Sequence, residues 1–146
     1  GIKGINLSER YYTLLKMKKR QAELLEHGVG HLDKLTGKNH KPKALAVFSE
    51  CRKIDTNFLP RADALFKLAG WINETGKTQA AVSIYNLFVK SYPQHPLVPK
   101  SYFRIAQLFH DRLMKTDKAN KILSALQMKY PQHEIMPHVE NFLARL

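Results

Sequence analysis

Apolar residues recur every three or four positions along most of this chain, and the first such segment runs from Leu7 to Leu35. This spacing predicts one long amphipathic helix. Gly28 and Gly30 lie inside it, and each glycine costs a helix about 1 kcal/mol relative to alanine. We therefore expect a bend or a break at these glycines. Residues 1–6, which precede the apolar run, are predicted to be a flexible leader.

Further segments show the same spacing, and Gly, Pro or polar residues separate them. They span residues 44–54, 62–72, 80–89, 102–109, 119–128 and 139–146. No segment sustains the alternation of apolar and polar residues that a half-buried strand requires. The pattern therefore predicts an all-α fold, in which short helices pair as antiparallel hairpins.

The connections between these segments contain an internal repeat. Residues 92–99 read YPQHPLVP and residues 130–137 read YPQHEIMP, an offset of 38 residues, and a fainter copy stands at residues 54–60. Each copy ends one apolar run and begins the next. A repeat of this period indicates an array of helical hairpins, each of which must stack on its neighbour to bury its apolar face.

Alanines lie where paired helices would cross. Ala69 and Ala81 occupy these places in one predicted hairpin, and Ala106 and Ala119 occupy them in the next. A small side chain at a crossing lets two helices approach to about 8–10 Å and interlock. We expect these four alanines to be buried between helices.

Composition and charge narrow the class of protein. The chain has 146 residues, of which 44% are hydrophobic and 25% charged, as in an ordinary globular domain. The formal net charge is +12, which favours acidic partners. Neither a signal peptide nor an apolar run of about 18 residues is visible. The chain does not begin with Met and can be part of a longer protein, so its location stays open, with the cytoplasm or the cytoplasmic face of a bacterial membrane favoured over the periplasm.

The second and third hairpins carry a recognisable set of packing residues. The positions are Leu65, Leu68, Ala69, Ile72, Ala81, Tyr85 and Pro93, then Tyr102, Ile105, Ala106, Phe109, Ala119, Leu123 and Pro131. This pattern resembles the tetratricopeptide repeat family over residues 24–146, with residues 1–23 as an N-terminal helix extension. The period of 38 exceeds the usual 34 and is similar to long-linker bacterial members from the cell envelope.

The resemblance implies a right-handed stack of about three antiparallel hairpins with a C-terminal capping helix. It also implies a non-catalytic scaffold that binds a peptide or protein partner in a concave groove, which the first helix of each hairpin lines. The predicted partner-binding residues are therefore Asp63, Phe66, Lys67, Asn73, Lys100, Phe103, Arg104, Gln107 and His110.

Within that set, Lys100 and Arg104 are four residues apart and should point the same way, as a pair of cations for a carboxylate. An acidic partner is the natural ligand for such a pair. Phe66 and Phe103 can add apolar contact, or they can pack between hairpins instead.

Catalytic and metal-binding alternatives have little support in the sequence. The triplet GKT at residues 76–78 lacks the glycine spacing and the preceding strand of a phosphate-binding loop. His27 and His31 share a helix face without further ligands at fixed spacing, so solvated histidines are favoured over a metal site. Cys51 lies on an apolar stripe, which favours a buried inert thiol. His110 and Asp111 are adjacent and point apart. We therefore expect no catalytic residue, no metal and no cofactor.

The alternative function is a basic helical module that contacts nucleic acid or an anionic membrane surface. The basic run that would do so is Lys16, Lys18, Lys19 and Arg20, although a solvated helix face is its simplest interpretation. Leu7, Tyr11 and Leu14 on the same helix are candidates for pairing with a second copy of the chain.

Overall fold

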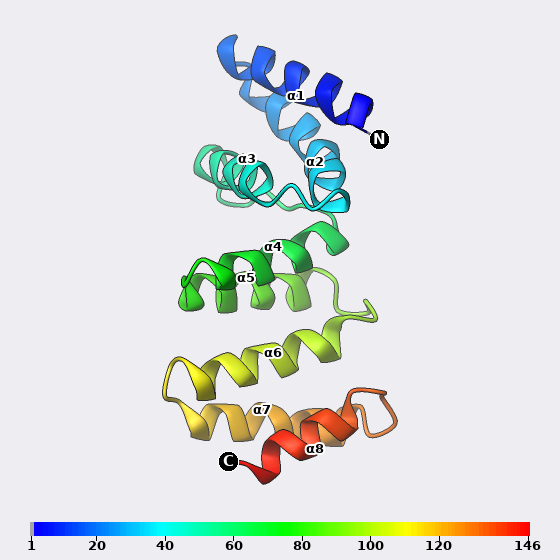
Figure 1. Ribbon diagram of the computed structural model, residues 1–146, viewed down its shortest axis with the longest axis vertical. Helices are drawn as coiled ribbons and strands as arrows, with labels where there is room; N and C mark the ends of the chain where they lie inside the picture. The colour runs from blue at the N-terminus through cyan, green and yellow to red at the C-terminus, as the bar shows by residue number, and fades with distance from the viewer. Residues whose placement is uncertain (1) are drawn as a thin grey trace. The chain divides into compact units, whose positions relative to one another are not determined.

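The computed structural model describes residues 2–146, and every regular element in that range is an α-helix (Figure 1). The helices are α1 (Ile2–Met17), α2 (Gln21–Gly37), α3 (Lys41–Ile54), α4 (Ala62–Glu74), α5 (Thr78–Ser91), α6 (Val98–Asp111), α7 (Thr116–Lys129) and α8 (Met136–Ala144). Consecutive helices pack against one another within α1 to α3 and within α5 to α8, and α6 with α7 is the most extensive pair. The predicted all-α fold of paired helices is confirmed.

The chain forms two compact units, Gly1–Trp71 and Ile72–Leu146. The first contains α1, α2, α3 and most of α4, and the second contains α5 to α8. The domain boundary predicted after residue 23 falls inside α2, near its first turn, and stays a prediction.

In the first unit the break in the N-terminal segment lies elsewhere than predicted. The long helix expected from Leu7 to Leu35 is two helices, and residues 18–20 separate them. Lys19 adopts a left-handed backbone conformation there (φ 54°). Gly28 and Gly30 lie inside an unbroken α2. The predicted leader is also wrong for residues 2–6, which belong to α1, while Gly1 lies outside the described residues.

Close packing explains why Gly28 does not break the helix. A Cβ atom built on Gly28 would lie 3.0 Å from Sγ of Cys51 and 3.6 Å from Cζ of Phe58. The missing side chain therefore admits α3 and the segment that follows it. Nothing lies within 4 Å of the corresponding position on Gly30. Tertiary contact thus outweighs the low helix propensity of glycine.

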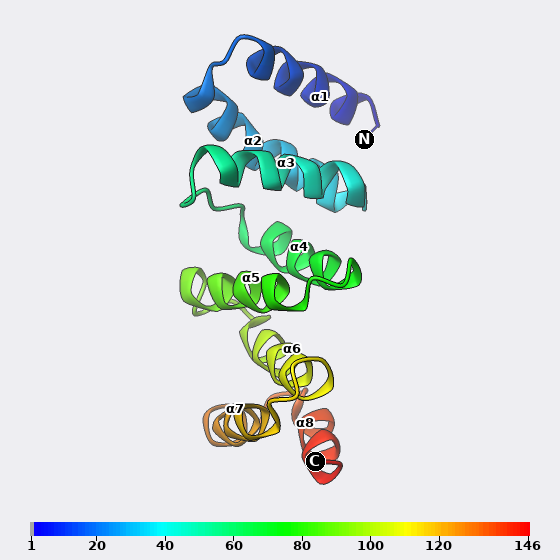
Figure 2. The same ribbon diagram turned by 90° about the vertical axis from the view of Figure 1, so that its left-hand side faces the viewer.

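In the second unit, α6, α7 and α8 surround one apolar core, and Figure 2 shows α7 and α8 lying beside each other near α6. Ala106 and Ala119 are fully buried in this core, as expected for residues where α6 and α7 cross. Val139 and Phe142 bring α8 into the same core. The helix α8 therefore caps the second unit, as predicted. Ala69 and Ala81 are also fully buried.

The two copies of the YPQH connection have the same hydrogen bonds. Nδ1 of His95 accepts from the backbone N–H of Leu97 at 3.1 Å, and Nδ1 of His133 accepts from that of Ile135 at the same distance. The backbone N–H of each histidine donates to the backbone carbonyl of the tyrosine in the same YPQH copy, at 3.0 Å in the first copy and 3.1 Å in the second. The histidine side chain thus accepts a hydrogen bond from the backbone N–H two residues later, as the side chain of Asp or Asn does in an Asx turn. The repeat read from the sequence is a repeat of backbone structure.

Candidate functional site

A pocket in the second unit contains four of the predicted partner-binding residues. Lys100, Phe103, Arg104 and Gln107 lie on one face of α6 and line a cavity of about 520 Å³. Their spacing of three, one and three residues brings four side chains to one side of a helix. The other lining residues are Pro96, Leu97, His133, Glu134, Ile135 and His138. We call this cavity the α6 pocket.

Both repeated connections contribute walls to the α6 pocket. Pro96 and Leu97 belong to the first YPQH connection, and residues 133–135 belong to the second. The hydrogen bonds from Leu97 and Ile135 to the histidine side chains fix these segments. His138 is added from the first turn of α8. The pocket is therefore held between two rigid turns and two helices.

The electrostatic character of the α6 pocket is basic. Lys100 is exposed and Arg104 half-buried, and their carboxylate-bearing neighbour in the lining is Glu134. Nη1 of Arg104 donates to the Tyr85 hydroxyl at 3.5 Å, a contact that holds the guanidinium toward α5. Burial raises the pKa of Tyr85, and the positive charge of Arg104 partly opposes that shift. The Tyr85 hydroxyl therefore stays protonated and accepts a hydrogen bond from the Arg104 guanidinium.

Phe103 faces two environments. Its ring meets the ring of Phe142 edge to face, with centroids 5.9 Å apart, and the half-buried side chain also lines the α6 pocket. The two alternatives for Phe103 are thus both realised, because an aromatic ring can pack with one edge and present its other side to a ligand.

His110 lies one turn beyond the pocket lining. Its Nδ1 lies 2.9 Å from the Thr116 hydroxyl, and its ring meets Phe142 edge to face at 5.7 Å. These contacts join the end of α6 to α7 and α8. A partner-binding role for His110 stays a prediction, and its described contacts are structural.

The predicted residues on α4 do not line the α6 pocket. Nζ of Lys67 donates to the carbonyl of Thr36 at 3.1 Å, near the C-terminal end of α2, where a cation is favourable. Asp63 is exposed, and Phe66 and Asn73 are half-buried. Partner binding by these four residues stays a prediction.

The basic run does not form one solvated helix face, because it crosses the end of α1 and the turn that follows. Nζ of Lys16 pairs with Glu50 of α3 at 3.0 Å, and Nε of Arg20 pairs with Glu23 at 3.3 Å. Lys18 and Lys19 are exposed. Lys16 therefore joins α1 to α3, whereas the pair of Arg20 with Glu23 is local to the start of α2.

The two histidines weighed as metal ligands are instead part of the contact between α1 and α2. Nε2 of His31 donates to Glu9 at 2.7 Å, and Nδ1 lies 2.7 Å from the Ser8 hydroxyl. Nε2 of His27 lies 3.0 Å from the carbonyl oxygen of Ser8. Within residues 2–146, no three His, Cys, Asp or Glu side chains are placed to hold a metal ion.

His31 and Cys51 are fully buried, which sets their chemistry. Burial lowers the pKa of His31, and Glu9 opposes this shift through its hydrogen bond and charge. Burial raises the pKa of Cys51 and holds it as the thiol, although the hydrogen bond between Cys51 and the Tyr12 hydroxyl acts in the opposite sense. A buried neutral thiol is a poor nucleophile. The interpretation of Cys51 as a buried packing residue agrees with this environment.

The sequence did not point to the residues that complete the α6 pocket, which are His133, Glu134, Ile135 and His138. They come from the second YPQH connection and the first turn of α8, about 30 residues away, and no local pattern relates them to α6. The repeat was the available signal. The repeat marked the connections as important, but it indicated only that each one ends one helix and begins the next.

These features define a helical-repeat protein with a basic, partly apolar pocket. Residues 63–95, which comprise nearly all of α4, α5 and the start of the first YPQH connection, match the family model described as a tetratricopeptide repeat. The predicted resemblance to the tetratricopeptide repeat family is confirmed over these residues. Membership of the bacterial long-linker type stays a prediction. No curated protein matches the chain.

The family match bears on function at a general level. The tetratricopeptide repeat is a protein–protein interaction module, typically part of a non-catalytic scaffold. No helix among residues 2–146 has both the length and the apolar character needed to cross a bilayer.

Proposed function

We propose that this chain is a non-catalytic interaction module whose α6 pocket binds an acidic segment of a protein partner. The observation that carries the proposal is the convergence of Lys100, Phe103, Arg104 and Gln107 with the two repeated connections around one cavity. The family match supports a protein as the partner, and the charge of the pocket supports an acidic one.

The chemistry of the lining suits a short peptide. Lys100 and Arg104 offer charge-assisted donors to a carboxylate, and Gln107 offers both a donor and an acceptor to a peptide group. Leu97, Phe103 and Ile135 supply apolar surface. The volume of about 520 Å³ falls in the range of about 300–1,000 Å³ that is usual for ligand pockets. A carboxylate and one or two neighbouring side chains would fill it.

The test uses a peptide selected on the wild-type chain from a displayed random library. We expect selection to enrich Asp and Glu. Lys100→Glu combined with Arg104→Glu should weaken binding of the selected peptide by about tenfold or more, because hydrogen bonds to charged groups contribute about 1.5–3 kcal/mol. Isothermal titration calorimetry measures the change.

The matched control is Lys90→Glu with Lys115→Glu, which alters net charge equally at exposed positions outside the α6 pocket. It should leave the affinity within about threefold of wild type, since isolated surface charges contribute little. Equal losses in both double variants, or unchanged binding in both, would contradict a site at the α6 pocket.

Contact of α1 with an anionic membrane is a second candidate. Ile2, Leu7 and Met17 are exposed by 75%, 61% and 76%, and Lys3 and Arg10 lie on the same helix. Apolar and basic residues together on one helix favour an interfacial location. Pairing with a second copy of the chain through Leu7, Tyr11 and Leu14, which are exposed, is a competing proposal for this helix. Nucleic-acid contact through the basic run is the alternative, and the salt dependence of binding distinguishes it from a peptide pocket.

A further inference from the structure

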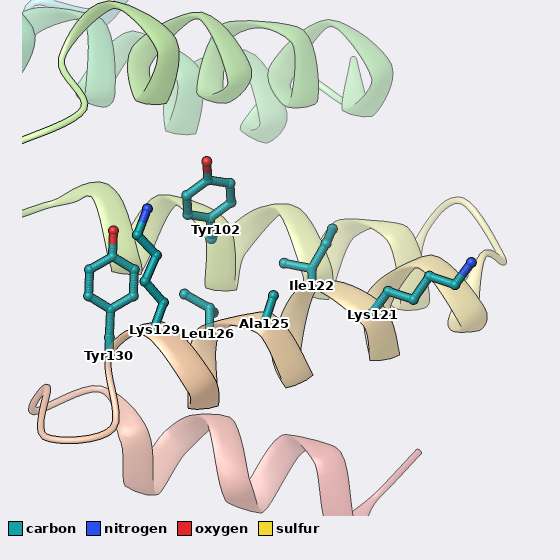
Figure 3. A pocket seen from close by; sticks show the side chains of 7 residues that line it. All are labelled: Tyr102, Lys121, Ile122, Ala125, Leu126, Lys129 and Tyr130. Atoms are coloured by element: carbon teal, nitrogen blue, oxygen red, sulfur yellow. The ribbon is translucent and has the colours of Figure 1, made fainter.

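A second cavity lies on α7, and it is built from two neighbouring rows of side chains. Lys121, Ala125 and Lys129 are four residues apart and form the outer row. Ile122, Leu126 and Tyr130 form the inner row, and Tyr102 of α6 closes the cavity from above (Figure 3). Its volume is about 320 Å³. We call it the α7 pocket.

The outer row gives the α7 pocket its shape. Ala125 is exposed and small, so it leaves a depression between two lysines that lie at opposite ends of the row (Figure 3). Eight residues of helix separate those lysines by about 12 Å along the axis. The inner row supplies an apolar floor, in which Leu126 is only 2% exposed. An apolar side chain can enter over Ala125 with a cation on either side.

The internal repeat indicates that this pocket is particular to the third hairpin. At an offset of 38 residues, the outer row becomes Ser83, Leu87 and Ser91, and alanine (Ala64) stands in place of Tyr102. The inner row keeps Ile84 and Tyr92 at the positions of Ile122 and Tyr130. The residues that the packing of a hairpin needs are thus retained. The residues that form a depression between two charges, which are Lys121, Ala125 and Lys129, occur in the third hairpin and not in the second.

We propose that the α7 pocket binds a helical segment of a protein partner in which one apolar side chain lies midway between two carboxylates eight residues apart. Such a segment presents an acidic, an apolar and a second acidic side chain in one row along the helix, each four residues from the next. That row is complementary in charge and in shape to Lys121, Ala125 and Lys129. Ridge-into-groove packing aligns two rows of this kind, and helix-in-groove binding is a common mode of recognition.

A second copy of this chain does not supply the occupant. In the helices described within residues 2–146, no acidic residue is followed at four and eight positions by an apolar residue and a second acidic residue. The chain also carries a net charge of +12, which disfavours self-association through a basic surface. The partner is therefore a different protein with an acidic amphipathic helix.

The probe is a designed alanine-based helical peptide with glutamates eight residues apart and a leucine midway between them. We expect it to bind the wild-type chain and to perturb the NMR signals of Ala125 and Tyr130. A peptide with lysines in place of the glutamates should bind about tenfold or more weakly, because two ion pairs become two repulsions.

Charge exchange makes the test specific. Lys121→Glu with Lys129→Glu should abolish preference for the glutamate peptide and create preference for the lysine peptide. Ala125→Leu, which copies Leu87 of the preceding hairpin, should weaken binding of the glutamate peptide by filling the depression. Both changes are at exposed helical positions, where substitution preserves the fold, and circular dichroism checks that it does.

The double variant Lys90→Glu with Lys115→Glu is the matched control, because it changes charge equally at exposed positions outside both pockets. It should leave affinity for the designed peptide within about threefold of wild type. Because the charge exchange at Lys121 and Lys129 is confined to α7, the α7 proposal can fail while the α6 proposal holds, and the reverse. Absence of binding, equal binding of both peptides to the wild-type chain, or insensitivity to Ala125→Leu would overturn the inference.

Discussion

At the scale of single residues, the two glycines of α2 have different roles in spite of their proximity. Gly28 is buried where Cys51 and Phe58 approach, whereas the position of a side chain on Gly30 is open. From the sequence alone, both glycines are expected to destabilise the helix equally. The distinction comes only from what lies opposite each one.

This difference predicts opposite effects of alanine. Gly30→Ala should stabilise the chain by about 0.5–1 kcal/mol, because alanine loses less backbone entropy and no atom obstructs its Cβ. Gly28→Ala should destabilise it by about 1 kcal/mol, since overpacking costs about 1–3 kcal/mol and outweighs the gain in propensity. Urea-induced unfolding of both variants measures the difference.

Cys51 supplies the control for this comparison. In a Cys51→Ala background the atom nearest to the new methyl group is gone, so Gly28→Ala should become less costly. If the cost of Gly28→Ala were the same in both backgrounds, the contact with Sγ would not be its cause.

At the scale of elements, α1 is held to its neighbours by a polar network as well as by apolar contact. Ser8 and Glu9 contact His31 of α2, while Tyr12 donates to Glu50 of α3 at 3.1 Å. Lys16 pairs with the same glutamate. The sequence predicted an amphipathic helix here. It did not predict that the chain reverses direction after α1, so that α2 packs against α1 and His31 is buried.

Burial of His31 predicts a dependence of stability on pH. Its folded-state pKa lies below the unfolded value of about 6.5, so the unfolded chain binds the proton more readily. The stabilising contribution is therefore complete above pH of about 6.5 and is lost as the pH falls through that value toward the folded-state pKa. The thermal midpoint should fall over this range, and differential scanning calorimetry at several pH values measures it.

His31→Gln should flatten that part of the pH profile, whatever its effect on absolute stability, because the glutamine side chain does not titrate. His40→Gln, at an exposed position in the turn before α3, should leave the slope as in wild type. A profile that His31→Gln does not alter would assign the slope to other groups.

At the scale of the whole molecule, the net charge of +12 attracts any polyanion, so binding of an anion alone does not identify the partner. Nucleic acid and an acidic peptide differ in how their binding responds to salt. Phosphate contacts release condensed counterions, whereas apolar contacts are nearly insensitive to salt. The two pockets each combine cations with apolar surface.

We therefore expect affinity for the selected acidic peptide to fall by less than about tenfold between about 50 and 200 mM NaCl. Binding to random-sequence duplex DNA through six or more phosphates would fall by about 10³-fold or more over the same range. Fluorescence anisotropy with both labelled ligands measures this. Parallel losses for peptide and DNA would favour the basic-module alternative over a peptide pocket.

The sequence by itself determined that the chain folds into paired helices and that one connection is repeated, but not where the first two helices divide. It also determined the α6 side of the α6 pocket, because Lys100, Phe103, Arg104 and Gln107 share one helix face and a local periodicity records such a face. The corresponding set on α4 could not be related to this pocket, since spacing within one helix carries no information about another.

Only the tertiary structure decided which atoms from distant segments meet. It placed His133 and Ile135 across from α6, put the turn at Lys19 and gave Gly28 a neighbour in Cys51. It also formed the depression over Ala125. A pattern of apolar residues states which face of a helix is buried, whereas the partner of that face and the gaps left between them depend on packing in three dimensions.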